Sequence, residues 1–265
     1  MKSSMNKICL FLSIVLLSNC SSGDKSRVVI VTNYGSIELQ LYDRTPAHSA
    51  NFVKLATEGY YDGLLFHRVI KNFKIQGGDP DSRSASSDAL LGSGGLEFCV
   101  PAEFVPESIH KRGALAAYRL EDNLNPERAS GAQFFIVQGR LYTDAELDQA
   151  EVEIGEGLAR DRYFQFFAQE EAAMVEAGDA VNSDSIVARA TRRASAWLLE
   201  NPYRMRSEDR EVYKTIGGIP LFDGEYTVFG EVIKGLNVVD KIAELETGVA
   251  DRPKVDVRIK RIRVK

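Results

Sequence analysis

The sequence is poor in the residues that build metal sites, disulfide frameworks and nucleic-acid surfaces. Its 265 residues include only three histidines and three cysteines, and the histidines lack the paired spacing of zinc ligands. The formal net charge of -5 and the pI near 5.4 indicate no basic face for phosphate. No G-x-S-x-G elbow of a serine hydrolase occurs, and the glycines within 92–95 lack the Gly-Lys-Ser/Thr of a phosphate-binding loop. We therefore expect no metal, no cofactor and no nucleic-acid partner.

Long apolar runs are also missing, but a short one lies near the start. Lys2 and Lys7 flank the beginning of an apolar run over 8–17, which has the layout of a secretory signal and is too short to span a bilayer. The run ends in Leu-Ser-Asn-Cys, which resembles the lipobox of bacterial lipoproteins, in which the cysteine is lipidated. Asn19 departs from the Gly, Ala or Ser usual before that cysteine. Cys20 is the candidate lipidation site.

This resemblance implies an exported protein with a lipid anchor in the bacterial cell envelope. We expect a signal peptide over 1–19 and a flexible tether over 20–26, and a signal cut without lipidation is the alternative. Ser21 after the lipidated cysteine favours the outer membrane, facing the periplasm. After processing only Cys99 would stay a free thiol, so no disulfide within the chain is expected.

Alternating β-branched and apolar runs predict a mainly β fold. The first two runs, 28–31 and 37–42, are joined by a turn with Gly35 where a positive φ is needed. Helices are expected from Pro46 to Gly59 and near 238–244, and further strands at 113–117, 133–138, 228–232 and 255–264. Many short strands with two helices predict a closed antiparallel barrel capped by two helices.

The segment 142–216 has a different composition. A capping-box pattern starts at Thr143 and Glu146, and the runs that follow lack strand alternation and predict helices. Asn201 and Pro202 end the last long helix. The prediction is an inserted helical subdomain that interrupts the barrel.

Three ordered blocks of polar and aromatic residues carry the functional signal. They are 66–79, which includes Phe-His-Arg-Val-Ile and Gln-Gly-Gly-Asp, then 131–137, which reads Gly-Ala-Gln-Phe-Phe-Ile-Val, and 222–230. In this order they resemble the cyclophilin family of peptidyl-prolyl cis-trans isomerases. The resemblance covers about 165 residues, 27–141 and 217–265, and implies an eight-stranded barrel that assists the folding of exported proteins. The partners would be proline-containing polypeptides, and we expect a monomer.

Isomerisation of an Xaa-Pro bond needs no covalent step, because the barrier of about 18–20 kcal/mol comes from amide resonance. A fixed donor aimed at the prolyl nitrogen lowers it as the bond twists, and arginine suits this role because its charge is permanent and its donors are planar. Such a charge-assisted hydrogen bond is worth about 1.5–3 kcal/mol, or one to two decades of rate. Arg68 is the candidate, and an apolar site must supply the rest.

The family pattern implies the remaining roles. Phe73 and Gln76 complete the catalytic set with Arg68; Gln76 would bind the substrate backbone and orient the arginine. The residues expected to bind substrate are His67, Tyr118, Arg119, Gln133, Phe135, Leu221, Phe222 and Tyr226, with Phe73, Phe135 and Phe222 forming the proline pocket.

Several positions depart from the best-known eukaryotic members. Lys74 replaces a methionine that supports the pocket, and its ammonium is expected to snorkel outward. Tyr118 and Arg119 replace a small residue and an amide, and Leu221 replaces a tryptophan that contacts cyclosporin. From these changes we expect cyclosporin to inhibit the protein only weakly, while its catalytic turnover is retained.

A second function class stays open. The barrel could serve as a proline-recognition scaffold in a binding or chaperone module, with the helical insertion holding a partner. The intact Arg68, Gln76 and Gln133 favour the enzyme. The insertion is expected to lie beside the groove as a lid that narrows the choice of clients, because both of its ends leave from segments that carry groove residues.

Overall fold

The computed structural model describes residues 26–119, 128–178 and 182–265; the predicted signal, lipidation site and most of the tether lie outside this part of the chain. The strands are β1 Arg27–Thr32, β2 Ser36–Leu41, β3 Phe66–Ile70, β4 Lys74–Gly77, β5 Cys99–Pro101, β6 Ala114–Ala117, β7 Arg128–Ser130, β8 Phe134–Val137, β9 Val228–Lys234 and β10 Ile259–Val264. The helices are α1 Pro46–Thr57, α2 Asp144–Ala177, α3 Ser183–Glu200, α4 Ser207–Thr215 and α5 Leu236–Ala243, with 3-10 turns η1 Pro80–Ser84, η2 Pro220–Phe222 and η3 Val249–Asp251.

Eight strands form one antiparallel, curled sheet in the order β10-β1-β2-β9-β6-β8-β4-β3. The predicted first hairpin is confirmed: Gly35 adopts a φ of 140° in the turn, and Ile30 lies opposite Ile37. Because side chains alternate along a strand, Val28 and Leu39 project to the same side as this pair, and all four are fully buried. β5 and β7 make a separate two-stranded sheet.

The prediction of a closed barrel is wrong, because the sheet is a half-barrel. β3 and β10 stand at its two ends and share no ladder. Leu65 and Arg258, next to these strands, form one isolated bridge, and the Phe66 amide donates to the Val257 carbonyl. On the N-terminal side of Arg258 the chain pairs with itself: Pro253 forms a local bridge with Thr247, and the Gly248 amide donates to the Arg252 carbonyl.

The two faces of the sheet carry different apolar clusters. The inner face forms the main core with both predicted helices, for Phe52 and Leu55 of α1 and Ile242 of α5 pack in it. The opposite face carries a smaller cluster around Phe135, with partly buried aromatic residues at its edge. Phe134 belongs to the first cluster and Phe135 to the second, as strand alternation requires.

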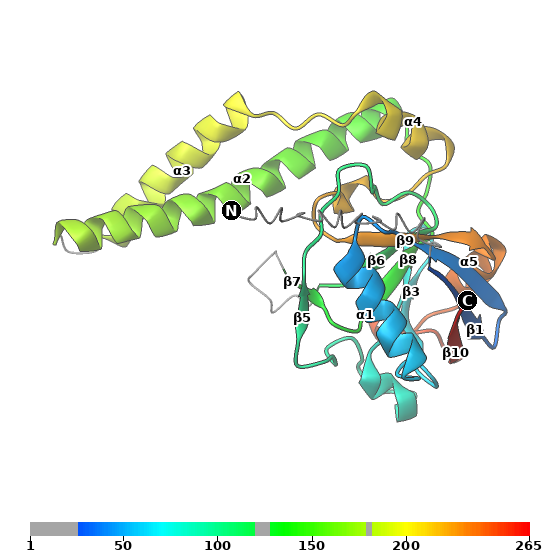
Figure 1. Cartoon of the computed structure of the whole chain (residues 1–265). Helices are drawn as coiled ribbons and strands as arrows, with labels where there is room; N and C mark the ends of the chain where they lie inside the picture. Colours follow the sequence, from blue (N-terminus) through cyan, green and yellow to red (C-terminus); the bar gives the residue numbers. More distant parts are fainter. Residues whose placement is uncertain (1–25, 120–127, 179–181) are drawn as a thin grey trace, which may run out of the picture.

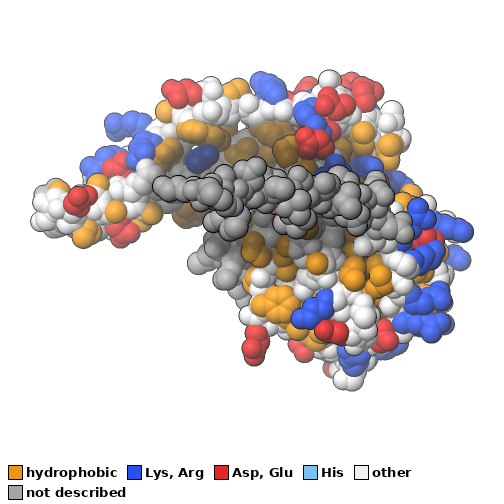
Figure 2. Space-filling view, viewed as in Figure 1, with side chains coloured by type: hydrophobic (Ala, Val, Ile, Leu, Met, Phe, Trp, Pro, Cys, Tyr) orange, Lys and Arg blue, Asp and Glu red, His pale blue; other side chains and the backbone are white. Residues whose placement is uncertain are grey.

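The helical segment forms an arm that projects from the half-barrel (Figures 1 and 2). Its capping box is confirmed, with the Thr143 amide donating to Glu146 Oε2 at 2.8 Å and the Glu146 amide to Thr143 Oγ1 at 3.3 Å. α2 runs unbroken through Gly155, where sequence indicated separate runs. A Cβ there would lie 3.3 Å from Leu198 of α3, so this glycine permits close packing of the two helices.

α2 and α3 are further joined by ion pairs, because Arg189 and Arg193 both contact Glu170 at 2.8–2.9 Å. Neither helix, nor any other in the described ranges, is long and apolar enough to cross a membrane.

Candidate active site

The strand register gathers the predicted catalytic residues on the outer face of the sheet. Arg68 of β3 lies opposite Gln76 of β4, and Gln76 lies opposite Phe135 of β8. Ala116 of β6 continues this row beyond Phe135. Because directly paired residues project to the same side, three strands place a cation, an amide and an aromatic ring in one line.

Two buried amides form the polar floor of this site. Gln76 Nε2 donates to Gln133 Oε1 at 2.9 Å, and Gln133 Nε2 donates to the carbonyls of Gly92 and Gly94 at 2.8 and 2.6 Å. Both side chains are 1% exposed. Gln76 Oε1 is buried and accepts no hydrogen bond from the described residues, so it is an unused acceptor at the floor of the site.

Arg68 is fixed by a residue that sequence reasoning missed. Its Nε donates to Asp251 Oδ2 at 3.1 Å. The side chains are 37% and 42% exposed, and an ion pair this open contributes only about 0–1 kcal/mol. Asp251 thus restricts the orientations of the Arg68 guanidinium, and the guanidinium stays partly exposed to solvent. Gln76, which the family pattern gives a part in orienting Arg68, lies directly opposite it on β4 and donates its own Nε2 to Gln133.

The predicted aromatic residues lie together beside this row. Ring centroids of Phe73 and Phe222 are 5.2 Å apart, those of Phe135 and Phe222 5.6 Å, and those of Phe222 and Tyr226 4.6 Å. Tyr118 stacks on Tyr226 at 6.4 Å. Such an apolar, aromatic surface is suited to a proline ring, which offers carbon atoms and no donor.

The model of a known family matches this chain. It is described as "Cyclophilin type peptidyl-prolyl cis-trans isomerase/CLD" and covers residues 27–158 and 204–264. The chain belongs to this family. It is accordingly a peptidyl-prolyl cis-trans isomerase, as the three sequence blocks predicted.

Curated relatives agree with the family model. A Staphylococcus epidermidis protein named "Putative peptidyl-prolyl cis-trans isomerase" is 30% identical over 239 residues, which are 90% of this chain and 91% of that protein. A Streptococcus pyogenes protein named "Putative bifunctional phosphatase/peptidyl-prolyl cis-trans isomerase" is 32% identical over 241 residues, and there the match spans only 38% of the relative.

A solved structure shares the fold. The crystal structure of a Cryptosporidium parvum cyclophilin superposes with a TM-score of 0.54 at 21% identity, covering 91% of this chain and 98% of the other. The same protein determined in the presence of the dipeptide Ala-Pro gives a TM-score of 0.52. At this identity the likeness establishes the cyclophilin fold.

Lys74 departs from the expectation made for it. The side chain is 2% exposed and does not snorkel to solvent. Its Nζ lies 4.7 Å from the ring centroid of Phe135, 4.8 Å from that of Tyr118 and 5.6 Å from that of Phe222. Attraction to several ring faces helps to hold the ammonium inside. In this cyclophilin a lysine therefore occupies the middle of the aromatic pocket, and Phe135 is fully buried.

His67 is not at the surface of the groove. It is 2% exposed, next to a register shift in β3, and neither ring nitrogen has a partner among the described residues. Burial lowers its pKa to about 4, so the imidazole is neutral near pH 7. A role in direct substrate contact is not supported by this position.

The rim of the groove holds the other predicted residues. Arg119 pairs with Glu225 at 3.0 Å and lies over the Tyr226 ring, with the guanidinium carbon 5.7 Å from its centroid. Leu221 is 40% exposed. Arg119 and Leu221 are thus accessible to a peptide that enters beside Phe222.

His110 has a role that the sequence did not indicate. It is fully buried and stacks on Phe135 at 6.0 Å. Its backbone amide lies 2.8 Å and its Nδ1 2.9 Å from Asp223 Oδ1, and the Tyr213 hydroxyl donates to Asp223 Oδ2 at 2.6 Å. This network fixes the loop that begins with Phe222 and ties it to α4.

Proposed function

We propose that this cyclophilin isomerises Xaa-Pro bonds of exported polypeptides and thereby assists their folding. Arg68 would be the electrostatic catalyst, Gln76 and Gln133 would hold the substrate backbone, and Phe73, Phe135 and Phe222 would enclose the proline ring. The observation that carries the proposal is the row formed by Arg68, Gln76 and Phe135 on three paired strands.

The arrangement can supply the chemistry that bond rotation needs. As the amide twists, the lone pair localises on the prolyl nitrogen, and a guanidinium within reach stabilises it. Arg68 contributes about 1.5–3 kcal/mol in this way, equal to one to two decades of rate. Removal of the bond from water by the aromatic surface, with Gln76 Oε1 binding a flanking amide, favours the twisted state further.

The test is the cis-to-trans exchange rate of a short Xaa-Pro peptide, measured by exchange NMR with wild type, Arg68→Ala and Arg192→Ala. Arg192 is a matched control, because it is an exposed arginine of α3 that is not among the predicted site residues. We expect acceleration by wild type and by Arg192→Ala, and a loss of ten- to a hundredfold in Arg68→Ala. Equal activity of Arg68→Ala and wild type would remove Arg68 from the mechanism.

A lipid anchor on Cys20 is the second part of the proposal. It is supported by the short apolar run and the Leu-Ser-Asn-Cys sequence that ends there. Expressed in a bacterium with labelled fatty acid, wild type and Cys99→Ala should carry the label and sediment with the outer membrane, and Cys20→Ala should do neither. Label retained by Cys20→Ala would refute the site.

We also propose that the protein is a monomer. A single species with the mass of one chain in analytical ultracentrifugation would support this.

The helical segment is proposed to be an insertion over 142–216 that acts on clients. The family model leaves 159–203 unmatched, which includes the outer part of α2 and all of α3. The placement of Lys74 among the pocket rings favours a binding or chaperone module as the second candidate function. Folded wild-type protein that binds Xaa-Pro peptides without speeding their exchange would select it over the enzyme.

A further inference from the structure

A large cleft separates the arm from the groove. Its volume is about 940 Å³, and it lies between α2 and the loop that carries Phe222 and Tyr226. Leu158 and Trp197 line it from the arm, and Leu221 lines it from the half-barrel. This volume is in the range of sites that hold ligands of several residues' size. Because Phe222 and Tyr226 belong to both, the cleft is continuous with the aromatic pocket.

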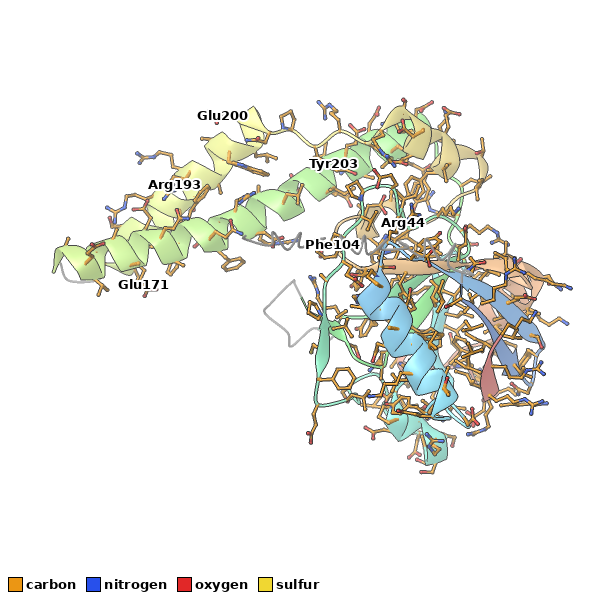
Figure 3. The ribbon with its side chains drawn as sticks, in the orientation of Figure 1. Arg44, Phe104, Glu171, Arg193, Glu200 and Tyr203 are labelled. Carbon is orange, nitrogen blue, oxygen red and sulfur yellow. The ribbon has the colours of Figure 1, made fainter. Side chains whose placement is uncertain are left out.

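The walls of the cleft expose apolar side chains from both parts of the molecule. Phe104 is 44% exposed, Leu158 39% and Leu221 40%. Apolar surface that faces a cleft from two sides is typical of a binding groove. A smaller cavity of about 290 Å³ extends it, again bounded by Phe104 and Leu158. Figure 3 labels Phe104 on the half-barrel and Tyr203 beside α2, which both line this cavity.

The rim of the cleft is polar and more acidic than basic. Arg119 is paired with Glu225, and Arg162 lies over the Trp197 ring at 5.1 Å. The charged residues around the cleft are Glu153, Glu156, Asp161, Asp223 and Glu225, with Arg119, Arg160 and Arg162. Asp223 is engaged by His110 and Tyr213, and Glu225 by Arg119. The remaining charged residues, Glu153, Glu156 and Asp161 with Arg160 and Arg162, keep a small excess of negative charge, which favours a ligand with basic rather than acidic side chains.

We propose that the cleft is an extended substrate subsite, which binds the apolar residues flanking the isomerised proline and prefers segments with lysine or arginine nearby. The occupant follows from continuity: a chain with its proline against Phe222 leaves the pocket past Tyr226 and Leu221 and enters the cleft. The extended subsite rests on the proposed function, because it assumes that the bound client places a proline in the aromatic pocket. The arm would then select clients by sequence beyond the Xaa-Pro bond.

Trp197 provides a direct readout, because it is the single tryptophan of the chain and lines the cleft. The full chain is titrated with a ten-residue peptide that has Ala-Pro at its centre, leucines on both sides and one lysine, and with the tetrapeptide core alone. We expect the long peptide to change Trp197 fluorescence to saturation and the tetrapeptide to leave it unchanged. The long peptide with proline replaced by alanine should still give a response, and acidic residues in place of lysine should weaken it.

Two variants place a charge on opposite walls of the cleft. Leu158→Asp on α2 and Phe104→Asp on the half-barrel are each expected to raise the Kd of the long peptide about tenfold. Both should lower kcat/KM for it by the same factor and leave the tetrapeptide within twofold of wild type. Leu199→Asp, on a residue of α3 that is 83% exposed and outside the cleft lining, is the control and should change neither.

The outcomes separate the two proposals. An unchanged Trp197 signal with the long peptide, or equal losses on both peptides in both cleft variants, would overturn the extended subsite. A normal Trp197 response from wild-type protein that accelerates neither peptide would reject the proposed isomerisation and leave the cleft as a binding site. Normal activity on both peptides, with no effect of Leu158→Asp or Phe104→Asp, would support the proposed isomerisation and reject the extended subsite.

Discussion

Replacement of Lys74 by methionine is expected to make this cyclophilin a faster isomerase. In the structure the ammonium lies 4.7–5.8 Å from four ring centroids, those of Phe73, Tyr118, Phe135 and Phe222. Phe135 is fully covered, with His110 stacked on it and Lys74 among its neighbours. A proline ring can reach Phe135 only after the Lys74 side chain has moved out of the pocket.

The size of the effect follows from what this movement costs. A desolvated ammonium against aromatic rings gains about 2 kcal/mol, and an exposed one about 0.5–1 kcal/mol. Counting the ring contacts alone and the hydration that Lys74 recovers when it leaves, we take about 1.4 kcal/mol as the net cost, which is tenfold in rate. Methionine is unbranched and apolar, adapts its shape to the rings and needs no displacement. Lys74→Met should therefore raise kcat/KM about tenfold.

The assay is cis-to-trans exchange of one Xaa-Pro peptide, with thermal unfolding of each variant measured in parallel. Lys71→Met is the control, since Lys71 follows β3 in the same hairpin and is 62% exposed, and its ion pair with Glu244 is equally open. It should leave kcat/KM unchanged. An unchanged or lower kcat/KM in a Lys74→Met protein that folds normally would refute the idea that Lys74 obstructs the pocket.

Three further predictions concern single groups of the site. Asp251→Asn should lower kcat/KM by about 1.4- to fivefold with KM little changed, because the open ion pair to Arg68 contributes about 0.2–1 kcal/mol to positioning; an effect as large as that of Arg68→Ala would mean that Asp251 does more than position Arg68. Cyclosporin should inhibit only weakly in a peptide exchange assay, because Leu221 is an exposed aliphatic where the inhibitor would need an aromatic partner, and nanomolar inhibition would contradict this. Burial holds the pKa of His67 at about 4 in the folded protein, below about 6.5 in the unfolded chain. The unfolded state then binds more protons between these values, so the free energy of unfolding should fall as pH drops from 6.5 to 4, by at most about 3 kcal/mol; urea titrations of wild type and His67→Phe should show a clearly shallower pH dependence in the variant.

The sequence predicted the positions of those residues that lie in strands with a clear local pattern. The family pattern assigned Phe135 to the pocket, and strand alternation does place it on the opposite face from Phe134; the blocks that contain Arg68, Gln76 and Gln133 lie together. These residues lie on paired strands or beside them. The alternation of side chains along a strand sets the face of the sheet to which each one projects, and the strand order of the family sets which residues lie next to it on that face.

The parts that sequence did not reveal depend on contacts between distant segments. Asp251 meets Arg68 from 183 residues away, through a turn in which its own φ is 58°. The buried Lys74 lies among four rings from separate segments, and a pattern that marks lysine as a surface residue does not predict such a position. The half-barrel was missed because the segments next to the two ends of the sheet form only the isolated Leu65–Arg258 bridge, a contact between distant segments that strand patterns do not reveal.

The base of the arm joins the half-barrel through two segments that are hydrogen-bonded to each other. Gly218 donates to the Arg140 carbonyl at 3.0 Å, and Tyr142 donates to the Tyr213 carbonyl at 3.1 Å. The sheet strands on either side therefore keep their places. Tyr213 also donates to Asp223, directly after the Phe222 that belongs to the pocket. Because Asp223 accepts from His110 as well, any shift of α4 strains a network in contact with Phe135, so the arm and the pocket share one rigid connection.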